Sequence, residues 1–163
     1  MKLLLLLICC KGLFNCCGND NVNIPDANFK AYLVGDSAIN TNGDNQIQVS
    51  EAIAFNDTIY CRNMNISNLK GIEAFISLTG LDCNGNQLTS LDVSKNSALT
   101  NLNCIDNQLT SLDVSKNTAL TSLSCSDNQL KSLDLSKNTA LTELYCNENH
   151  FDCAALISKY GID

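Results

Sequence analysis

Three consecutive segments of 21 residues, 81–101, 102–122 and 123–143, have nearly the same sequence. The middle segment reads LNCIDNQLTSLDVSKNTALTS, and most of its columns are identical in all three copies. Self-similarity at a period of about 20 to 50 residues is the signature of a solenoid, in which each repeat forms one coil. A single coil cannot bury its own apolar edge, so it needs a neighbour on either side. The sequence therefore predicts a stack of coils rather than one closed core.

Each copy begins with alternating apolar residues that are followed by an asparagine. Leu102 and Cys104 are two residues apart, so both side chains leave the same face of a short strand. Asn107 follows at a turn, where its amide can satisfy backbone groups of its own coil and of the next. The equivalent residues are expected to stack into a ladder, one per coil. They are Asn86, Asn107, Asn128 and Asn149.

The pattern L-x-x-L-x-C-x-x-N-x-L over residues 99–109 resembles the leucine-rich-repeat family, with Cys in the last strand position. The resemblance extends over roughly residues 53–151. The 21-residue repeats are similar to those of internalin-like surface proteins, and residues 22–56 resemble the cap that precedes such repeats in Bacteroidetes-type bacteria. The resemblance implies a bacterial leucine-rich-repeat surface protein.

The second half of each copy repeats the alternation. Leu112 and Val114 are again two residues apart, and Asn117 follows them. This pattern predicts a second extended segment on the opposite side of each coil. Together with the resemblance, it gives the expected fold class of a repeat solenoid. We expect a right-handed leucine-rich-repeat superhelix, dominated by β-structure, with two short strands per 21-residue coil and small helical caps at both ends.

The chain divides into five predicted parts. These are a signal peptide (1–17), a polar tether (18–23), an N-terminal helical cap (24–56), leucine-rich repeats (57–151) and a C-terminal cap (152–163). The apolar run after Lys2 is too short to span a bilayer and is typical of a secretory signal. In a lipoprotein signal, a Cys after the run is acylated, and Cys16 or Cys17 is the candidate. A plain cleaved signal and an unprocessed tail are the alternatives.

A cysteine recurs in the last strand position of successive units. These residues are Cys61, Cys83, Cys104, Cys125 and Cys146. Zinc sites typically use closely spaced cysteine pairs, which the repeats lack. Free Cys packs as a small hydrophobe. We therefore expect these thiols to fill the core, without a disulfide framework, and Cys153 lies outside the series.

Residues 40–51 within the N-terminal cap are similar to an EF-hand or dockerin loop. Side-chain oxygens occur at alternate positions and a glutamate closes the loop, which indicates a calcium site. The candidate ligands are Asn40, Asn42, Asp44, Gln46 and Glu51. Two departures count against calcium: the first ligand is Asn rather than Asp, and the sixth position is Asn45 rather than Gly. The alternative is an Asn-rich turn that caps a helix starting near Ser50.

Positions that differ between the copies cluster in the first strand and in the turn after it. Here the outward residues vary while the inward ones do not, which indicates an interaction surface. The candidate binding residues are Asp82, Asn84, Asn103, Ile105, Asp106, Ser124, Ser126, Asp127 and Tyr145. Tyr145 adds the one aromatic residue of this stripe. Drift after a recent duplication would produce the same variability, so both interpretations stay open.

Charge and residue types exclude some classes of function. A net charge of −7 without clusters of Lys and Arg argues against nucleic acid. The single histidine, His150, has no nucleophile beside it, so no catalytic residues are expected and the chain is not expected to be an enzyme. No cofactor is expected, and calcium in the loop of residues 40–51 is the one exception that the sequence leaves open.

The expected function is a non-catalytic cell-surface binding module that contacts a protein or glycan, on another cell or in the envelope, through its sheet. The alternative is a structural spacer of the cell envelope, stabilised by calcium. We expect an exported monomer, either an outer-membrane or cell-surface lipoprotein that touches the membrane through a lipid anchor only, or a secreted protein.

Overall fold

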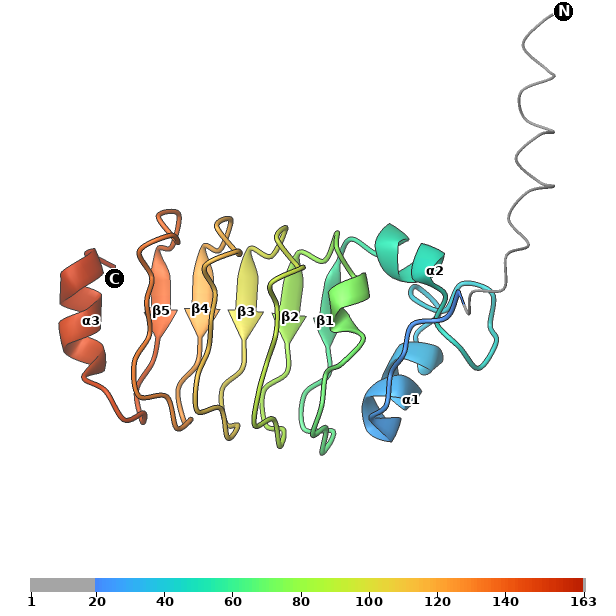
Figure 1. Cartoon of the computed structure of the whole chain (residues 1–163), viewed down its shortest axis with the longest axis horizontal. Coiled ribbons are helices and arrows are strands. Elements are labelled where there is room, and N and C mark those ends of the chain that lie inside the picture. Colours follow the sequence, from blue (N-terminus) through green and yellow to red (C-terminus); the bar gives the residue numbers. More distant parts are fainter. Residues whose placement is uncertain (1–19, 163) are drawn as a thin grey trace, which may run out of the picture.

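Five short parallel strands form one sheet along the length of the molecule (Figure 1). They are β1 (Thr58–Tyr60), β2 (Gly80–Asp82), β3 (Asn101–Asn103), β4 (Ser122–Ser124) and β5 (Glu143–Tyr145). Strand order in the sheet follows strand order in the chain, so each coil adds one strand beside the previous one. This computed structural model describes residues 20–162. The predicted signal peptide and the lipidation candidates Cys16 and Cys17 lie outside the described residues.

The side chains that point into the solenoid form two buried columns. Leu81, Leu102 and Leu123 align in register and are at most 2% exposed. The cysteines two residues further on form the second column, and Cys61, Cys83, Cys104 and Cys125 are free and fully buried. Apolar burial between coils is the main stabilising contribution, because no coil can cover its own edges. The prediction of core thiols is confirmed for these four residues.

An asparagine ladder runs beside the cysteine column, as predicted. Asn107 Nδ2 donates to the carbonyls of Cys83 and Cys104, at 3.1 Å each, and so links two coils. Asn107 Oδ1 accepts the Leu88 N–H at 3.0 Å. The other members make the equivalent bonds; they are Asn86, Asn128 and Asn149. Each side chain therefore adds to the backbone hydrogen bonds that already join its turn to the turn of the next coil.

The second segment of each coil is extended but is not a strand. The Asp92 carboxylate accepts the Ser94 N–H at 2.9 Å, and the Val93 carbonyl accepts the Asn96 N–H at 3.0 Å. Asn117 Nδ2 of the next coil also donates to the Val93 carbonyl, at 2.9 Å. These bonds occupy backbone groups that a second ladder would need. The prediction of two strands per coil is therefore wrong, and each coil contributes one.

Small helices close both ends of the stack (Figure 1). The N-terminal cap holds α1 (Ala27–Gly35) and α2 (Val49–Ala54), and the 3-10 helix η2 (Ile72–Ala74) lies in the first, irregular unit. Tyr32 from α1 accepts the N–H of Tyr60 through its hydroxyl at 3.0 Å, so the cap satisfies a group on the edge strand β1. Among the described residues, no helix is long and apolar enough to cross a bilayer.

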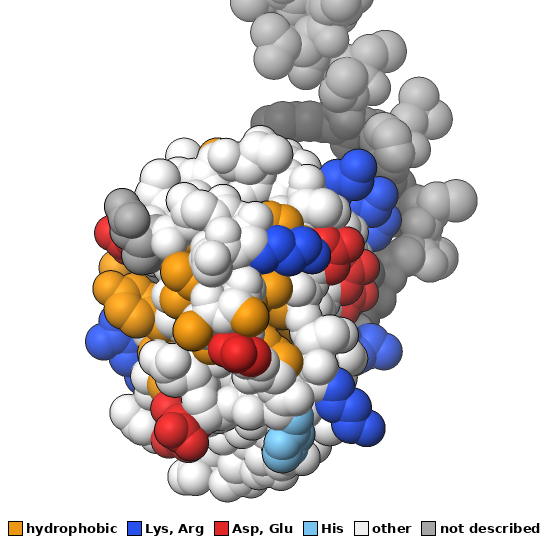
Figure 2. Space-filling model, turned by 90° about the vertical axis from the view of Figure 1, so that its left-hand side faces the viewer, with side chains coloured by type: hydrophobic (Ala, Val, Ile, Leu, Met, Phe, Trp, Pro, Cys, Tyr) orange, Lys and Arg blue, Asp and Glu red, His pale blue; other side chains and the backbone are white. Residues whose placement is uncertain are grey.

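The predicted C-terminal cap contains α3 (Cys153–Tyr160), and Asp152 caps this helix by accepting the Ala155 N–H. A disulfide joins Cys146, in the last coil, to Cys153 at the start of α3. The expectation that Cys146 is a core thiol without a disulfide partner is therefore wrong. Its column has no further coil to pack against, so this sulfur meets the cap instead. Figure 2 faces this end and shows hydrophobic side chains gathered on it, with charged side chains beside them.

Candidate interaction surface on the parallel sheet

The strand register aligns one outward residue from each strand into a row across the sheet. This row, which we call the sheet-face row, consists of Tyr60, Asp82, Asn103, Ser124 and Tyr145. Its two ends are aromatic and well exposed, at 56% for Tyr60 and 54% for Tyr145. Its centre is polar. Adjacent strands lie about 4.8 Å apart, so the two tyrosines are roughly 19 Å apart along the row.

The β1 end of the row is held by an ion-pair network. The Arg62 guanidinium lies 2.6 Å from the Asp82 carboxylate and 5.5 Å from the centroid of the Tyr60 ring. Asn103 Nδ2 donates to the same carboxylate oxygen at 3.1 Å, and Asp82 is only 6% exposed. A buried carboxylate with several donors fixes the side chains around it. This part of the face is therefore ordered before any partner arrives.

Sequence reasoning missed Tyr60 and Arg62. The sequence did contain a signal, because Tyr60 directly precedes Cys61 just as Tyr145 directly precedes Cys146. Tyr145 is therefore not the one aromatic residue of its stripe, and the stripe has an aromatic residue at each end.

The row borders a shallow depression of about 280 Å³ that extends over β1 to β4. Besides the members of the row, hydroxyl and amide side chains line it; they are Thr58, Asn101 and Ser122. The opposed charges of Arg62 and Asp82 balance within it. The depression is thus polar and close to neutral.

The other predicted binding residues lie just beyond the strands. Asn84 and Ile105 are half-buried beside the row, and Ser126 is only 9% exposed, so it offers little surface. Asp106 and Asp127 are exposed, and both have a φ near +53°. That left-handed conformation favours Gly, Asn and Asp, so backbone geometry restricts this column. The same column holds Asn63, Gly85 and Glu148, all with positive φ.

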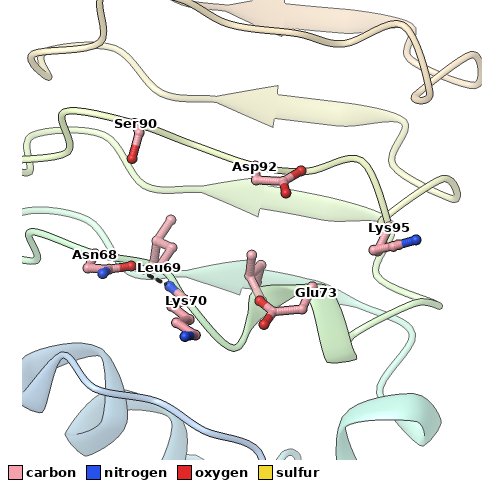
Figure 3. A pocket seen from close by; sticks show the side chains of 8 residues that line it. Asn68, Leu69, Lys70, Glu73, Ser90, Asp92 and Lys95 are labelled. Atoms are coloured by element: carbon pink, nitrogen blue, oxygen red, sulfur yellow. Dashed lines mark hydrogen bonds between the residues drawn. The ribbon is translucent and has the colours of Figure 1, made fainter.

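The second-segment side of the coils carries a separate recess of about 330 Å³, where the irregular first unit meets the next coil (Figure 3). Lys70, Glu73, Asp92 and Lys95 contribute the charged side chains of its lining. Both carboxylates are already engaged locally, since Glu73 accepts the Gly71 N–H at 2.7 Å and Asp92 accepts that of Ser94. Each carboxylate of the recess therefore already accepts a hydrogen bond from the backbone.

Local hydrogen bonds also explain why the Asp column of the second segment does not vary. Asp113 accepts the Ser115 N–H at 2.8 Å, and Asp134 accepts that of Ser136 at 2.9 Å. The bond from Ser115 lowers the pKa of Asp113. These aspartates close a turn in each coil. These bonds account for the invariance on this side. On the sheet side, the equivalent bond occurs in two copies only, where Asp82 accepts the Asn84 N–H at 3.3 Å and Asn103 accepts the Ile105 N–H at 3.2 Å.

The predicted calcium ligands lie together in the cap loop. Asn42 Oδ1 accepts the Asp44 N–H at 2.9 Å, and Asn40 Nδ2 donates to the Asp44 carbonyl at 2.7 Å. The Glu51 carboxylate accepts N–H bonds from Thr41 at 2.8 Å and from Gln48. Gln46 binds Lys30 Nζ through its side-chain oxygen. No group of three His, Cys, Asp or Glu side chains within the described chain converges in a way that could hold a metal.

The fold and the exposed sheet define a leucine-rich-repeat solenoid with one strand per coil. Its architecture is similar to that of the functional domain of InlJ from Listeria monocytogenes, which includes a cysteine ladder; the TM-score is 0.69, at 39% identity over 77% of this chain. InlF, an internalin of the same species, has a TM-score of 0.65 at 21% identity over 84% of this chain. The BIR2 ectodomain of Arabidopsis thaliana shares the fold at a TM-score of 0.50, with 21% identity over 66% of this chain.

The chain is an internalin-like leucine-rich-repeat protein, as the sequence predicted. It spans 27% of the InlJ chain and 47% of the InlF chain. No family model matches its sequence, and no curated protein is similar to it. The cysteine column of residues 61, 83, 104 and 125 is similar to the cysteine ladder of InlJ.

Proposed function

We propose that this chain is an exported, non-catalytic binding module that contacts a protein or a glycan through the exposed face of its sheet. The observation that carries the proposal is the sheet-face row, a polar strip with a well-exposed tyrosine at each end and a pre-formed Arg62–Asp82 pair. Exposed aromatic residues over an ordered polar surface are typical of recognition sites. Leucine-rich-repeat neighbours support a protein-interaction module in general terms.

The proposal includes a place at the cell surface, as a monomer held by a lipid on Cys16 or Cys17 or released as a secreted protein. Incorporation of labelled palmitate tests the anchor. A lipid-anchored chain takes up label, and replacing the acylated Cys by Ser abolishes it. Uptake by neither the parent chain nor its variants would leave secretion as the alternative.

The binding function is tested with arrays of extracellular proteins and of glycans. A variant with Tyr60→Ala, Asn103→Ala and Tyr145→Ala removes the two aromatic ends and the central amide of the row. The matched control replaces three exposed lysines on the second-segment side, Lys95, Lys116 and Lys137, by Ala. We expect binding to be lost only in the first variant. Equal binding by both variants, or no ligand on either array, contradicts the proposal.

A second candidate function is a spacer of the cell envelope whose N-terminal cap is stabilised by calcium. The observation that favours it is Asn40 Oδ1, which is buried and accepts no hydrogen bond within the described part of the chain. All five candidate side chains offer oxygen atoms, which suits calcium. Binding would require Glu51 to exchange its bonds from Thr41 and Gln48 for the ion. Calorimetric heat with calcium, lost in Asp44→Ala, supports this function, and the absence of heat in the parent chain ends it.

A further inference from the structure

We propose that the sheet-face row between Tyr60 and Tyr145 binds a short, uncharged oligosaccharide, an inference that rests on the proposed function of this face. The row is a strip of roughly 19 Å whose ends are aromatic and whose middle consists of the paired Asp82 carboxylate, an amide and a hydroxyl. The depression extends over β1 to β4 and Tyr145 lies on the next strand, so this surface fits a linear ligand that lies across the strands.

The aromatic ends match the faces of sugar rings. A pyranose presents C–H groups on its faces, and their weakly positive hydrogens complement the negative face of an aromatic ring. More than half of each tyrosine is exposed, at 56% and 54%. The Arg62 guanidinium lies 5.5 Å from the Tyr60 ring centroid and orients this ring. A chain of sugars can therefore stack at both ends of the row.

The middle of the row matches sugar hydroxyls. Amide and hydroxyl side chains both donate and accept hydrogen bonds, as sugar hydroxyls do. Ser124 supplies such a group in the row, and Asn103 supplies the amide hydrogen and the oxygen lone pair that its bonds to Asp82 and Ile105 leave over. Asn101 and Ser122 supply such groups along the adjacent side of the depression. They repeat at the strand spacing of about 4.8 Å, which is similar to the length of one sugar unit. Successive sugars thus meet equivalent partners.

The balance of charge selects an uncharged ligand. Arg62 is paired with Asp82, so the depression presents no isolated positive charge to a carboxylate or sulfate. Exposed acidic side chains lie at its margins; they are Asp106, Asp127 and Glu143. They repel anionic sugars. A protein partner is less well matched, because protein interfaces centre on buried apolar anchors and the residues between the tyrosines are all polar.

Saturation-transfer NMR of the purified chain with cellohexaose, chitohexaose and mannohexaose tests the proposal, with oligogalacturonate as the anionic probe. At least one uncharged probe is expected to bind, and the anionic probe is not. Tyr60→Ala and Tyr145→Ala should each weaken binding roughly three- to tenfold. Tyr60→Phe, which keeps the ring, should bind like the parent chain. Lys116→Ala, an exposed position on the second-segment side, is the control for a change outside the row, and circular dichroism verifies the fold of each variant.

Two outcomes overturn the oligosaccharide inference: none of the three uncharged probes binds, or binding survives the loss of both tyrosines. The protein and glycan arrays separate this failure from failure of the proposed function. If only proteins bind, and the triple variant of the sheet-face row loses them, the binding module stands and its ligand is a protein. If nothing binds on either array, both proposals are wrong.

Discussion

Each coil has two buried asparagines, and we expect Asn→Ala to lower the free energy of unfolding by different amounts at the two positions. Asn107 and Asn117 are both buried, at 8% and 0% exposure, so replacing either by Ala removes the same atoms from a comparable environment. Their hydrogen bonds differ. Asn107 Oδ1 accepts the Leu88 N–H at 3.0 Å, whereas Asn117 Oδ1 has no partner within residues 20–162. That bond is therefore the main difference between the two positions, beside the extra bond from Asn107 Nδ2 to the Ile105 carbonyl at 3.1 Å.

Asn107→Ala leaves a buried donor without an acceptor. The Leu88 N–H loses its partner, which costs about 1 to 3 kcal/mol. The two amide hydrogens of Asn107, which are shared among the carbonyls of Cys83, Cys104 and Ile105, together contribute about 2 kcal/mol. The sum is a loss of about 3 to 5 kcal/mol in the free energy of unfolding. Such a loss is large against the total stability of a small domain.

Asn117→Ala leaves every backbone group with a partner. The two carbonyls that it serves keep their own turn bonds, because Val93 accepts the Asn96 N–H at 3.0 Å and Asn96 accepts the Leu99 N–H at 3.1 Å. The substitution also removes a buried oxygen that lacks a donor. We expect a loss of only about 1 to 2 kcal/mol.

Urea denaturation followed by far-ultraviolet circular dichroism measures the difference. The midpoint of Asn107→Ala should fall clearly below that of Asn117→Ala, with Gln108→Ala as an exposed control close to the parent chain. Equal midpoints for the two asparagine variants would refute the assignment of the ladder energy to the Leu88 N–H. A lower midpoint for Asn117→Ala would show instead that the second-segment asparagine contributes more to stability than Asn107 does.

Three further predictions concern Glu148, the buried thiols and the disulfide. Glu148 is held at a φ of +52°, so Glu148→Gly should raise the free energy of unfolding by about 1 kcal/mol in urea denaturation. Burial raises the pKa of the Cys125 thiol to about 12 and that of Cys104 well above its usual value, so native labelling at pH 8 should be slow. The unfolded thiols ionise near pH 9 while the folded ones stay protonated, so stability should fall between about pH 9 and 12. Reducing the Cys146–Cys153 disulfide should cost about 2.5 kcal/mol and speed hydrogen exchange in α3 but not in the central strands. Fast native labelling, or exchange that is uniform along the chain, would contradict the last two predictions.

Periodicity made the interior of this protein predictable. A side chain two residues from a buried Leu must share its face, so the burial of Cys104 followed from spacing alone. The turn asparagines followed from their place after the strand. These inferences concern contacts between one coil and its copy, and the copy is visible in the sequence.

The features that the sequence did not predict lie where the repeats end or where local backbone hydrogen bonds determine the secondary structure. The Cys146–Cys153 disulfide forms at the last coil, where the partner of Cys146 is a helix and not another copy. The single strand per coil reflects local turn bonds such as that from Ser94 to Asp92, which hydrophobic alternation does not reveal. Arg62 was missed because its partner Asp82 lies on the next strand and has no charged counterpart in later copies.

Conformation also separates two kinds of variable position on the sheet side. Gly85, Asp106 and Asp127 differ between copies, yet all have a positive φ, so their column varies within the residue types that tolerate this backbone. A Cβ at Gly85 would lie 2.0 Å from the Asn63 side chain, which restricts this site further. The sheet-face row has no such constraint, because its members lie in regular strands. Variation at Asn103 is therefore better evidence for selection by a partner than variation at Asp106, and the row is where substitutions should be concentrated first.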